Sequence, residues 1–411
     1  MLFLEKKHQK ELLLRRATLK NIIIPCPVRG GEASVESEAL QNQIGPNSPP
    51  GEVSEDQAPV ASEAQKKPRR RHNVLRTIAF LLIMVLAFDI AGRYISIFAV
   101  DGLVFWRTTD FYREDRDSLD AVVLGSSSTY SFWDATYAWK QYGVTAYPYS
   151  TPQQPLASTC FVLEECRKTQ PDAVYLINLN LALVTDVETA MIHFLSDVMP
   201  PSLNRIRMIE YLCDKGGFEG ISNKLEYYYP IFAMHERWRL CHLPEKGKSG
   251  KNCKGGSVDS TYLKNVEDVT DGIYFTDARA EIPEETREEL DHIFAYLEEN
   301  NVRAAFFMSP APTSEPVMEM INTVCDYVSD AGYIVYNGFE HFDEIGLDVR
   351  TDYCDNSHTN IYGAQKFTYW LSGQLIADFS LPDHRGDEAY RSWDEAYEHY
   401  TWVVRTKQMT G

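Results

Sequence analysis

The chain reads AVVLGSSST from Ala121 to Thr129, and this short stretch decides the fold. Its first four residues are β-branched or apolar, which is typical of a strand buried on both faces of a parallel sheet. The run ends in a glycine and three serines, so the strand would bring hydroxyl groups to its carboxyl end. Open α/β sheets bind their ligands at that edge. The stretch therefore predicts a parallel sheet with a serine-bearing site at the end of its first strand.

Strand-like and helix-like patterns alternate on both sides of a long interruption. Strands are expected at 121–124, 144–149, 173–183, 302–308 and 333–336, and helices at 130–140, 155–168, 283–297, 314–329 and 360–378. Thr359 or Asn360 would cap the last helix. An alternating order of this kind predicts a parallel sheet with right-handed crossovers and helices on both faces. The fold class is therefore α/β, a three-layer sandwich around a central parallel sheet.

The alternation is interrupted at about 185–276, where polar, aromatic and basic residues replace it. We expect a mainly helical insertion that covers the open end of the sheet as a lid or substrate platform. Within it, His235, Arg237 and Trp238 are suited to bind an acidic or sugar substrate, because arginine binds anions and tryptophan stacks on sugar rings. Packing of the insertion onto the sheet explains the same residues equally well.

The first part of the chain, residues 1–73, is rich in charged residues, Gly, Pro and Ser and predicts a disordered tail. It ends in a basic cluster, and an uninterrupted apolar run follows at 77–88. A membrane-spanning helix at 74–99 would be a few residues short unless Arg76 and Arg93 extend toward the two interfaces. A buried core helix and a cleaved signal peptide are the alternatives.

The triple-arginine flank argues against a core helix, and no small-x-small cleavage site follows the apolar run. By the positive-inside rule the tail is cytoplasmic, and everything from about Tyr94 lies across the membrane. The chain is thus predicted to be a single-pass type II membrane protein with an exported domain at 100–381. An acidic and aromatic extension follows at 382–411.

Composition excludes several classes of function. A formal net charge of -19 argues against nucleic-acid binding, which needs a cationic face. No CxxC, HExxH or phosphate-loop spacing occurs, so we expect neither a metal nor a nucleotide cofactor. Seven of the eight cysteines lie in the predicted exported part, and Cys241 with Cys253 is the pair we expect to form a disulfide.

A second motif lies far downstream, where Asp355-Asn356-Ser357-His358 precedes the last predicted helix. A serine is a weak nucleophile that needs a base within hydrogen-bond reach, and the base needs a group to orient it. The strand-end serines, His358 and Asp355 supply the residue types of such a site. A strand-end serine alone would more often be a turn or cap residue.

Both motifs resemble those of the SGNH/GDSL hydrolases. These enzymes carry Gly-x-Ser after the first strand and Asp-x-x-His before the last helix, and the resemblance covers roughly residues 120–378 apart from the insertion. It implies a flavodoxin-like fold with Ser127 as nucleophile, His358 as general base and acid, and Asp355 as the residue that orients His358. Ser126 and Ser128 are the rivals of Ser127.

The resemblance also implies an oxyanion hole made by three donors. These are the N–H of Ser127, a backbone N–H after the second strand, and an asparagine amide after the third. Ser150 stands where the family has the glycine of the second block, so the backbone geometry there departs from the pattern. Asn178 and Asn180 compete for the third place and are expected on one side of the strand. A buried amide bonded to a neighbouring loop explains either asparagine as well.

The Gly-Ser-Ser sequence and the single N-terminal span are similar to the membrane-anchored branch of this family. That branch includes the D-alanyl transfer protein of lipoteichoic acid synthesis and alginate-type O-acetyltransferases. It implies acyl transfer or ester hydrolysis on a cell-envelope polysaccharide or teichoic-acid-like polymer, with a polytopic membrane-bound O-acyltransferase as donor partner. The rival is a non-catalytic envelope assembly factor that binds polymer or the acyltransferase, and Ser150 favours it. The acyl group and the acceptor stay open.

Overall fold

The computed structural model describes residues 69–99, 107–183, 191–215, 224–234, 253–256 and 272–410. The chain divides into two compact units, Met1–Lys67 and Pro68–Gly411. The predicted tail lies outside the described residues up to residue 68. Its last five residues, 69–73, belong to a helix, so this helix begins five residues before the predicted helix at 74–99.

Five parallel strands form the sheet at the centre of the second unit. They are β1 (Ala121–Gly125), β2 (Ala146–Ser150), β3 (Val174–Asn178), β4 (Ala304–Met308) and β5 (Val335–Asn337), in the order β2-β1-β3-β4-β5. Every residue of β1, β2 and β3 is buried, as the apolar composition of these strands predicts. The predicted parallel α/β sheet is confirmed. The order is that of doubly wound folds whose strand order reverses between β1 and β3.

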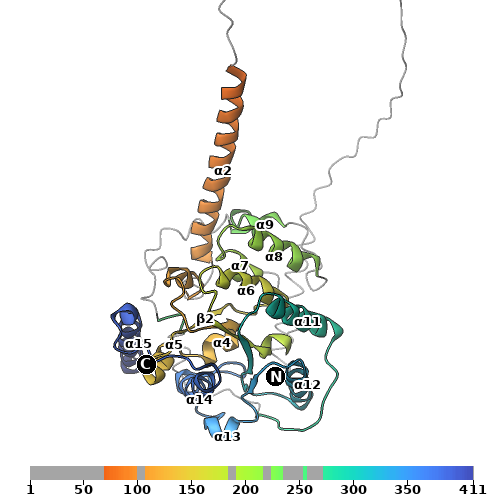
Figure 1. The fold of residues 1–411 in the computed structure, drawn as a ribbon, viewed down its shortest axis with the longest axis vertical. Helices are drawn as coiled ribbons and strands as arrows, with labels where there is room; N and C mark the ends of the chain where they lie inside the picture. Colours follow the sequence, from red (N-terminus) through yellow and green to blue (C-terminus); the bar gives the residue numbers. More distant parts are fainter. Residues whose placement is uncertain are drawn as a thin grey trace, which may run out of the picture. The chain divides into compact units, whose positions relative to one another are not determined.

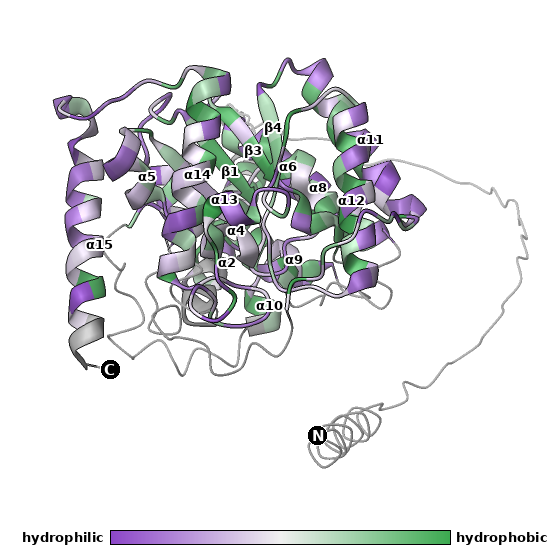
Figure 2. Cartoon of the chain, turned by 90° about the horizontal axis from the view of Figure 1, so that it is seen from below, coloured by the Kyte–Doolittle hydropathy of each residue, from purple (hydrophilic) through white to green (hydrophobic). Residues whose placement is uncertain are grey.

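Helices cover both faces of this sheet. On one face α4 (Ser127–Phe132) and α5 (Ala135–Tyr142) pack against α14 (Ile361–Phe379), and on the other α6 (Thr159–Arg167) packs against α11 (Glu284–Glu299). The β1-to-β2 and β2-to-β3 connections run in opposite directions, so right-handed crossovers place their helices on opposite faces. Figure 2 shows the hydrophobic strands β1, β3 and β4 between these two layers. Helix α12 (Glu315–Asp330) connects β4 to β5.

The predicted helix at 130–140 is wrong in its boundaries. The chain turns into α4 directly after β1, at Ser127, and breaks at Trp133 before α5 begins. Asp134 causes the break, because its Oδ1 accepts hydrogen bonds from the backbone N–H of Tyr137 (3.0 Å) and the hydroxyl of Thr136 (2.8 Å) and caps α5. The consequence for the site is that Ser127 opens a helix.

The predicted strand at 173–183 is too long. β3 ends at Asn178, and a 3-10 helix, η3 (Leu179–Leu183), follows it. The side chain of Asn178 accepts a hydrogen bond from the backbone N–H of Asn180 (2.8 Å), a local bond that replaces the ladder of the sheet. Asn180 therefore lies in η3, and the expectation that both asparagines share one side of a strand is wrong.

The C-terminal extension forms helix α15 (Arg391–Thr410), which the sequence patterns did not predict. It packs against α5 (Figure 1), and the indole Nε1 of Trp139 donates to Asp394 (2.9 Å). Trp393 is 1% exposed and lies against the ring of Trp139. The extension is thus packed onto the α/β unit through aromatic side chains.

The described part of the insertion is mainly helical, as predicted, with short non-helical stretches at 253–256 and 272–276. It contains α7 (Ile192–Ser196), α8 (Leu203–Asp214), α9 (Leu225–Tyr228) and α10 (Ile231–Met234). Short helices also occur outside it: η1 (Asp110–Arg113), η2 (Leu156–Ser158), α13 (Phe342–Ile345) and η8 (Glu388–Tyr390).

Helix α2 (Arg69–Ala99) is the N-terminal element of the described chain (Figure 1). Residues Asn73–Gly92 within it have a mean hydropathy of 2.3, and residues 73–88 are all exposed, whereas Gly92 at the end of the segment is buried. At about 1.5 Å per residue the helix exceeds the roughly 30 Å hydrocarbon core of a bilayer. The expectation that the helix would be a few residues too short to cross a bilayer is therefore corrected, because α2 continues without a break beyond the apolar run. By length and composition, α2 is able to cross a membrane.

Candidate active site

Gly125 ends β1 at a point where the chain has no room for a side chain. A Cβ atom there would lie 2.0 Å from Oγ1 of Thr129 and 2.7 Å from Cβ of Asn178. The close approach lets the backbone turn from the strand into α4, whose first residue is Ser127. The glycine of the motif is therefore required by packing, and it places the three serines at the carboxyl edge of the sheet.

The three serines differ in their surroundings. Ser126 and Ser128 are buried, with their hydroxyl oxygens 3.2 Å apart, and Ser128 also accepts a hydrogen bond from Nδ2 of Asn178 (3.0 Å). Ser127 is partly exposed. A nucleophile must be reached by its substrate, so Ser127 is the best placed of the three.

Asp355 and His358 form a hydrogen-bonded pair. Nδ1 of His358 lies 2.9 Å from each carboxylate oxygen of Asp355, and the same carboxylate accepts from the backbone N–H groups of Ser357 (2.7 Å) and His358 (2.9 Å). Burial alone would raise the pKa of Asp355, but its bonds to the His358 side chain and to these two N–H groups hold that pKa below the usual range. The carboxylate is thus suited to keep a proton on Nδ1 and direct Nε2 away from itself.

The loop that carries this pair packs on α4. The hydroxyl of Thr359 donates to the backbone carbonyl of Ser131 (2.5 Å), and Tyr353 and Thr359 form an isolated antiparallel bridge that closes the loop. Ser131 lies one helical turn after Ser127, on the same face of α4. Asn360 then caps α14 by accepting from the N–H groups of Tyr362 and Gly363, as predicted. The fold therefore brings the Asp355-His358 loop against the helix that Ser127 begins.

Both asparagines form hydrogen bonds inside the protein. The Nδ2 of Asn178, a fully buried residue, donates to the hydroxyls of Ser128 (3.0 Å), Thr129 (3.0 Å) and Ser309 (3.2 Å). Asn180 donates from Nδ2 to the carbonyl of Ser309 (3.2 Å) and accepts from its N–H (2.9 Å). These are the bonds of side chains that hold loops together, which is the alternative explanation that the sequence left open.

Ser309 is a residue of this network that no sequence motif singles out. It follows β4 directly and is fully buried. The position of Ser309 at the end of a predicted strand was the sequence signal that could have pointed to it. Its bonds to β3 and η3 could not be foreseen, because they depend on which strands are neighbours in the sheet. Ser309 thus helps to hold the carboxyl edge of the sheet together.

Ser150 lies opposite Gly125 in the register of β1 and β2. Ser150 is fully buried, and its hydroxyl forms no hydrogen bond within the described part of the chain.

The predicted substrate residues His235, Arg237 and Trp238 lie outside the described residues, as does Cys241 of the predicted disulfide. In the described ranges, no group of three or more His, Cys, Asp and Glu residues is placed to hold a metal ion.

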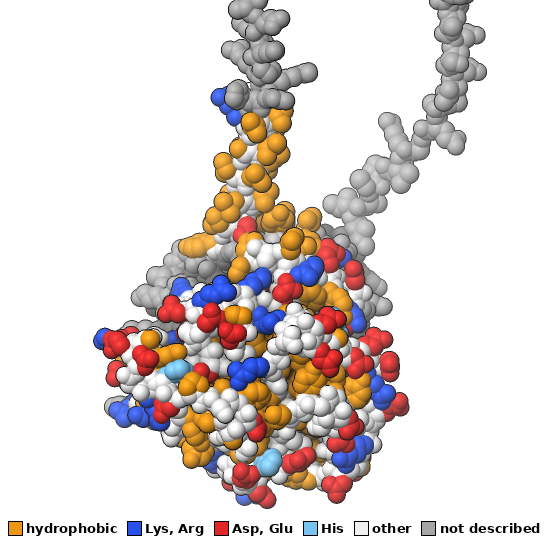
Figure 3. Space-filling view, viewed as in Figure 1, with side chains coloured by type: hydrophobic (Ala, Val, Ile, Leu, Met, Phe, Trp, Pro, Cys, Tyr) orange, Lys and Arg blue, Asp and Glu red, His pale blue; other side chains and the backbone are white. Residues whose placement is uncertain are grey.

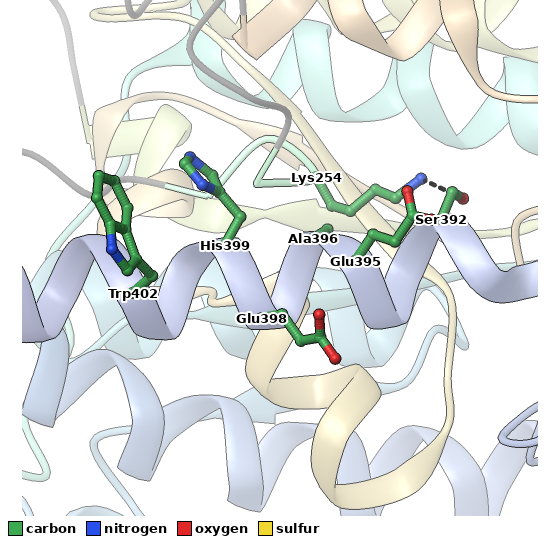
Figure 4. Close-up of a pocket in the computed structure, with 7 residues that line it drawn as sticks. All are labelled: Lys254, Ser392, Glu395, Ala396, Glu398, His399 and Trp402. Carbon is green, nitrogen blue, oxygen red and sulfur yellow. Dashed lines mark hydrogen bonds between the residues drawn. The ribbon is translucent and has the colours of Figure 1, made fainter.

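A cavity of about 900 Å³ lies along α15 and contains none of the predicted site residues (Figure 4). It is lined by Lys254, Ser392, Glu395, Ala396, Glu398, His399 and Trp402. Ser392 and His399 lie roughly 10 Å apart along the axis of one helix, too far for a hydrogen bond. Nζ of Lys254 is already bound to Glu114 (2.8 Å) and Ser392 (3.0 Å). The serine and the histidine of this cavity are therefore too far apart to act together as nucleophile and base.

The fold and the loop define an α/β protein in which a loop with an aspartate–histidine pair is hydrogen-bonded to the helix that a strand-end serine begins. Comparison of the chain with protein-family models, curated proteins and solved structures finds no match. The functional argument accordingly depends on the motifs and on the geometry described above.

Proposed function

We propose that the protein is a membrane-anchored, exported serine-dependent acyltransferase or esterase of SGNH type. The observation that supports it best is the Asp355-His358 pair, held in a loop that bonds to the helix beginning at Ser127. The parallel sheet, whose strand order reverses beside β1, agrees with the flavodoxin-like topology of that family.

The proposed reaction proceeds in two steps. Oγ of Ser127 attacks the carbonyl carbon of an acyl ester while Nε2 of His358 takes the hydroxyl proton, and Asp355 stabilises the resulting imidazolium. His358 then returns the proton to the departing alcohol, which leaves an acyl group on Ser127. In the second step Nε2 of His358 takes the proton of a sugar hydroxyl or water as its oxygen attacks the acyl carbon, and His358 then gives that proton to Oγ of Ser127, which leaves and is restored as a hydroxyl.

Negative charge on the attacked carbonyl oxygen needs hydrogen-bond donors. The backbone N–H groups of Ser127 and Ser150 are the proposed donors of the main chain. An amide from Asn180 or Asn178 is the proposed third donor, and it would share or exchange its present bonds to serine atoms.

The proposed setting follows from α2 and the basic cluster before it. The catalytic domain would lie outside the cytoplasm and act on a cell-envelope polysaccharide or teichoic-acid-like polymer. A polytopic membrane-bound O-acyltransferase is the proposed donor partner, as in the membrane-anchored enzymes that the motifs resemble.

Hydrolysis of p-nitrophenyl acetate by the full-length protein tests the proposal. Ser127→Ala should lower kcat by roughly 10³-fold or more, because serine is the group that forms the acyl intermediate. Ser126→Ala and Ser128→Ala are matched controls from the same turn and should keep most of the activity. Equal losses in all three variants would contradict the assignment of Ser127.

A second function is favoured by the bonds of Asn178 and Asn180. If both amides stay bound to protein atoms and Ser150 does not supply a donor, the site lacks a full oxyanion hole and the protein would act as a non-catalytic envelope assembly factor. Wild-type protein that binds polymer without turnover of any acyl ester would support this second function.

A further inference from the structure

We propose that the α8–α10 face of the domain docks on the lipid bilayer surface beside α2. Four large apolar side chains on this face are exposed: Leu203 (78%), Ile206 (45%), Leu225 (53%) and Phe232 (51%). We call this set the apolar rim. The docking proposal rests on the proposed membrane crossing of α2 and goes beyond it, because a crossing helix alone does not require the domain to touch the bilayer.

The rim begins where the apolar span ends. A Cβ added at Gly92, the last residue of the span, would lie 3.1 Å from the backbone nitrogen of Ile231 and 3.4 Å from Cδ of Pro230. The start of α10 therefore packs on α2 at the level where the span leaves the hydrocarbon core. Figure 1 shows α8 and α9 near the same end of α2.

The elements of the rim are connected to one another. Side-chain nitrogens of Arg205 in α8 donate to the backbone carbonyls of Tyr227 (2.7 Å) and Tyr228 (3.3 Å) in α9. Helix α9 in turn packs against α10. Because α8, α9 and α10 are joined, a membrane boundary at Gly92 would bring their exposed side chains to the same surface.

Helix α8 carries apolar residues on two faces. Met208, Ile209 and Leu212 are buried and point into the protein, whereas Leu203 and Ile206 are exposed on the other side. A helix at the surface of a soluble domain needs only the first face. Figure 3 shows hydrophobic side chains at the foot of α2, where the helix meets the domain. The second face is the kind of surface that interfacial helices insert into the headgroup boundary.

Charge does not explain the rim. Among the described residues near it, Arg207 pairs with Glu164, Lys215 pairs with Glu289, and Lys224 bonds to Asp214 (2.8 Å) and Glu210. Paired cations give little attraction to anionic lipid. We therefore expect docking on neutral phosphatidylcholine vesicles as well as on anionic ones.

Three exposed phenylalanines provide a matched test: Phe80 in the span (63%), Phe232 in the rim (51%) and Phe275 outside both (56%). The photo-crosslinker p-benzoyl-L-phenylalanine is incorporated at each position in turn, and the full-length protein is reconstituted in phosphatidylcholine vesicles that contain a tagged lipid. We expect lipid crosslinks from positions 80 and 232, and several-fold fewer from position 275. Leu203→Glu combined with Leu225→Glu should lower the yield at 232 and leave that at 80 unchanged.

The outcomes separate docking from spanning. Crosslinks at 80 without crosslinks at 232 would overturn docking and leave the membrane crossing intact. No crosslinks at either position would overturn both the membrane crossing and the docking. Equal lipid crosslink yields at 232 and 275 would show that the domain meets lipid only by random collision, which would overturn docking. Crosslinks from 232 to a protein in native membranes, with none to lipid in vesicles, would assign the rim to a protein partner and contradict the proposal.

Discussion

Gly125 is the residue whose replacement should disturb the site most directly through packing. Gly125→Ala forces a methyl group against Thr129 and Asn178, and overpacking of this kind costs about 1–3 kcal/mol. We expect the free energy of unfolding to fall by about that amount in denaturant titrations of the full-length protein. Gly272→Ala is the control, since a Cβ there meets nothing within 4 Å and should change stability little. Equal effects at the two positions would contradict the packing argument.

Asp355 makes a pH-dependent contribution at the same scale. Its folded-state pKa is lowered, so the carboxylate stabilises the folded protein above the unfolded pKa of about 3.9, and this stabilisation is lost as the pH falls through the folded value. Asp355→Asn should therefore be less stable than the wild type at neutral pH, and the difference should shrink in acid. Thermal unfolding at a series of pH values measures this. A difference that is the same at every pH would show that the charge of Asp355 plays no part.

At the residue scale, the local motifs were the predictable part of the site. The Gly-x-Ser and Asp-x-x-His spacings single out Ser127, Asp355 and His358, and the last two meet within one short loop. The partner of Asn180 and the part that Ser309 plays could not be predicted, because the bonds between these two residues form only after β3 and β4 have become neighbours. Long-range pairing of this kind leaves no mark in the local pattern.

Among the elements, the strands were predicted to within a few residues at most ends, since their apolar runs are short and bounded by turn residues. The errors came from single polar side chains that bond to the backbone. Asp134 divides one predicted helix in two, and Asn178 ends one predicted strand early. Such bonds compete with regular structure, and composition averaged over a segment does not record them.

Helix α15 was missed because its burial depends on two aromatic residues among many charges. Trp393→Ala removes a side chain that is 1% exposed and packed on Trp139, and the resulting cavity should cost about 3–5 kcal/mol in unfolding free energy. Trp402→Ala, in the same helix at 62% exposure, is the matched control and should cost far less. Chemical denaturation measures the free energy of unfolding of both variants. Equal losses of this free energy in the two variants would show that α15 does not pack as described.

For the whole molecule, the apolar helix was predictable from the sequence, because the helix expected at 74–99 ends where α2 ends and begins only five residues after the start of α2. The apolar run alone stops at residue 88, but α2 continues to Ala99. Helix α10 then packs on it at Gly92. Hydropathy measures solubility in lipid and does not record that another helix packs on one end of the apolar segment. The apolar helix α2 and the α/β domain are therefore described by different physical signals.

The site itself is a property of the whole molecule, because Ser127 and His358 are distant in the sequence and only the fold brings α4 and the loop of His358 together. If they act as nucleophile and base, Ser127 should be far more reactive than an ordinary serine hydroxyl. An ordinary serine does not react with fluorophosphonates at a useful rate. Fluorophosphonates form a covalent phosphonyl adduct on an activated serine.

Peptide mapping by mass spectrometry after fluorophosphonate treatment of the full-length protein is the most direct test. We predict an adduct on Ser127 in the wild type, a strongly reduced yield in His358→Ala, and the wild-type yield in the control His341→Ala, which replaces a half-buried histidine paired with Glu344. An unmodified Ser127 in the wild type, or an adduct whose yield does not depend on His358, would contradict the proposed serine-dependent chemistry.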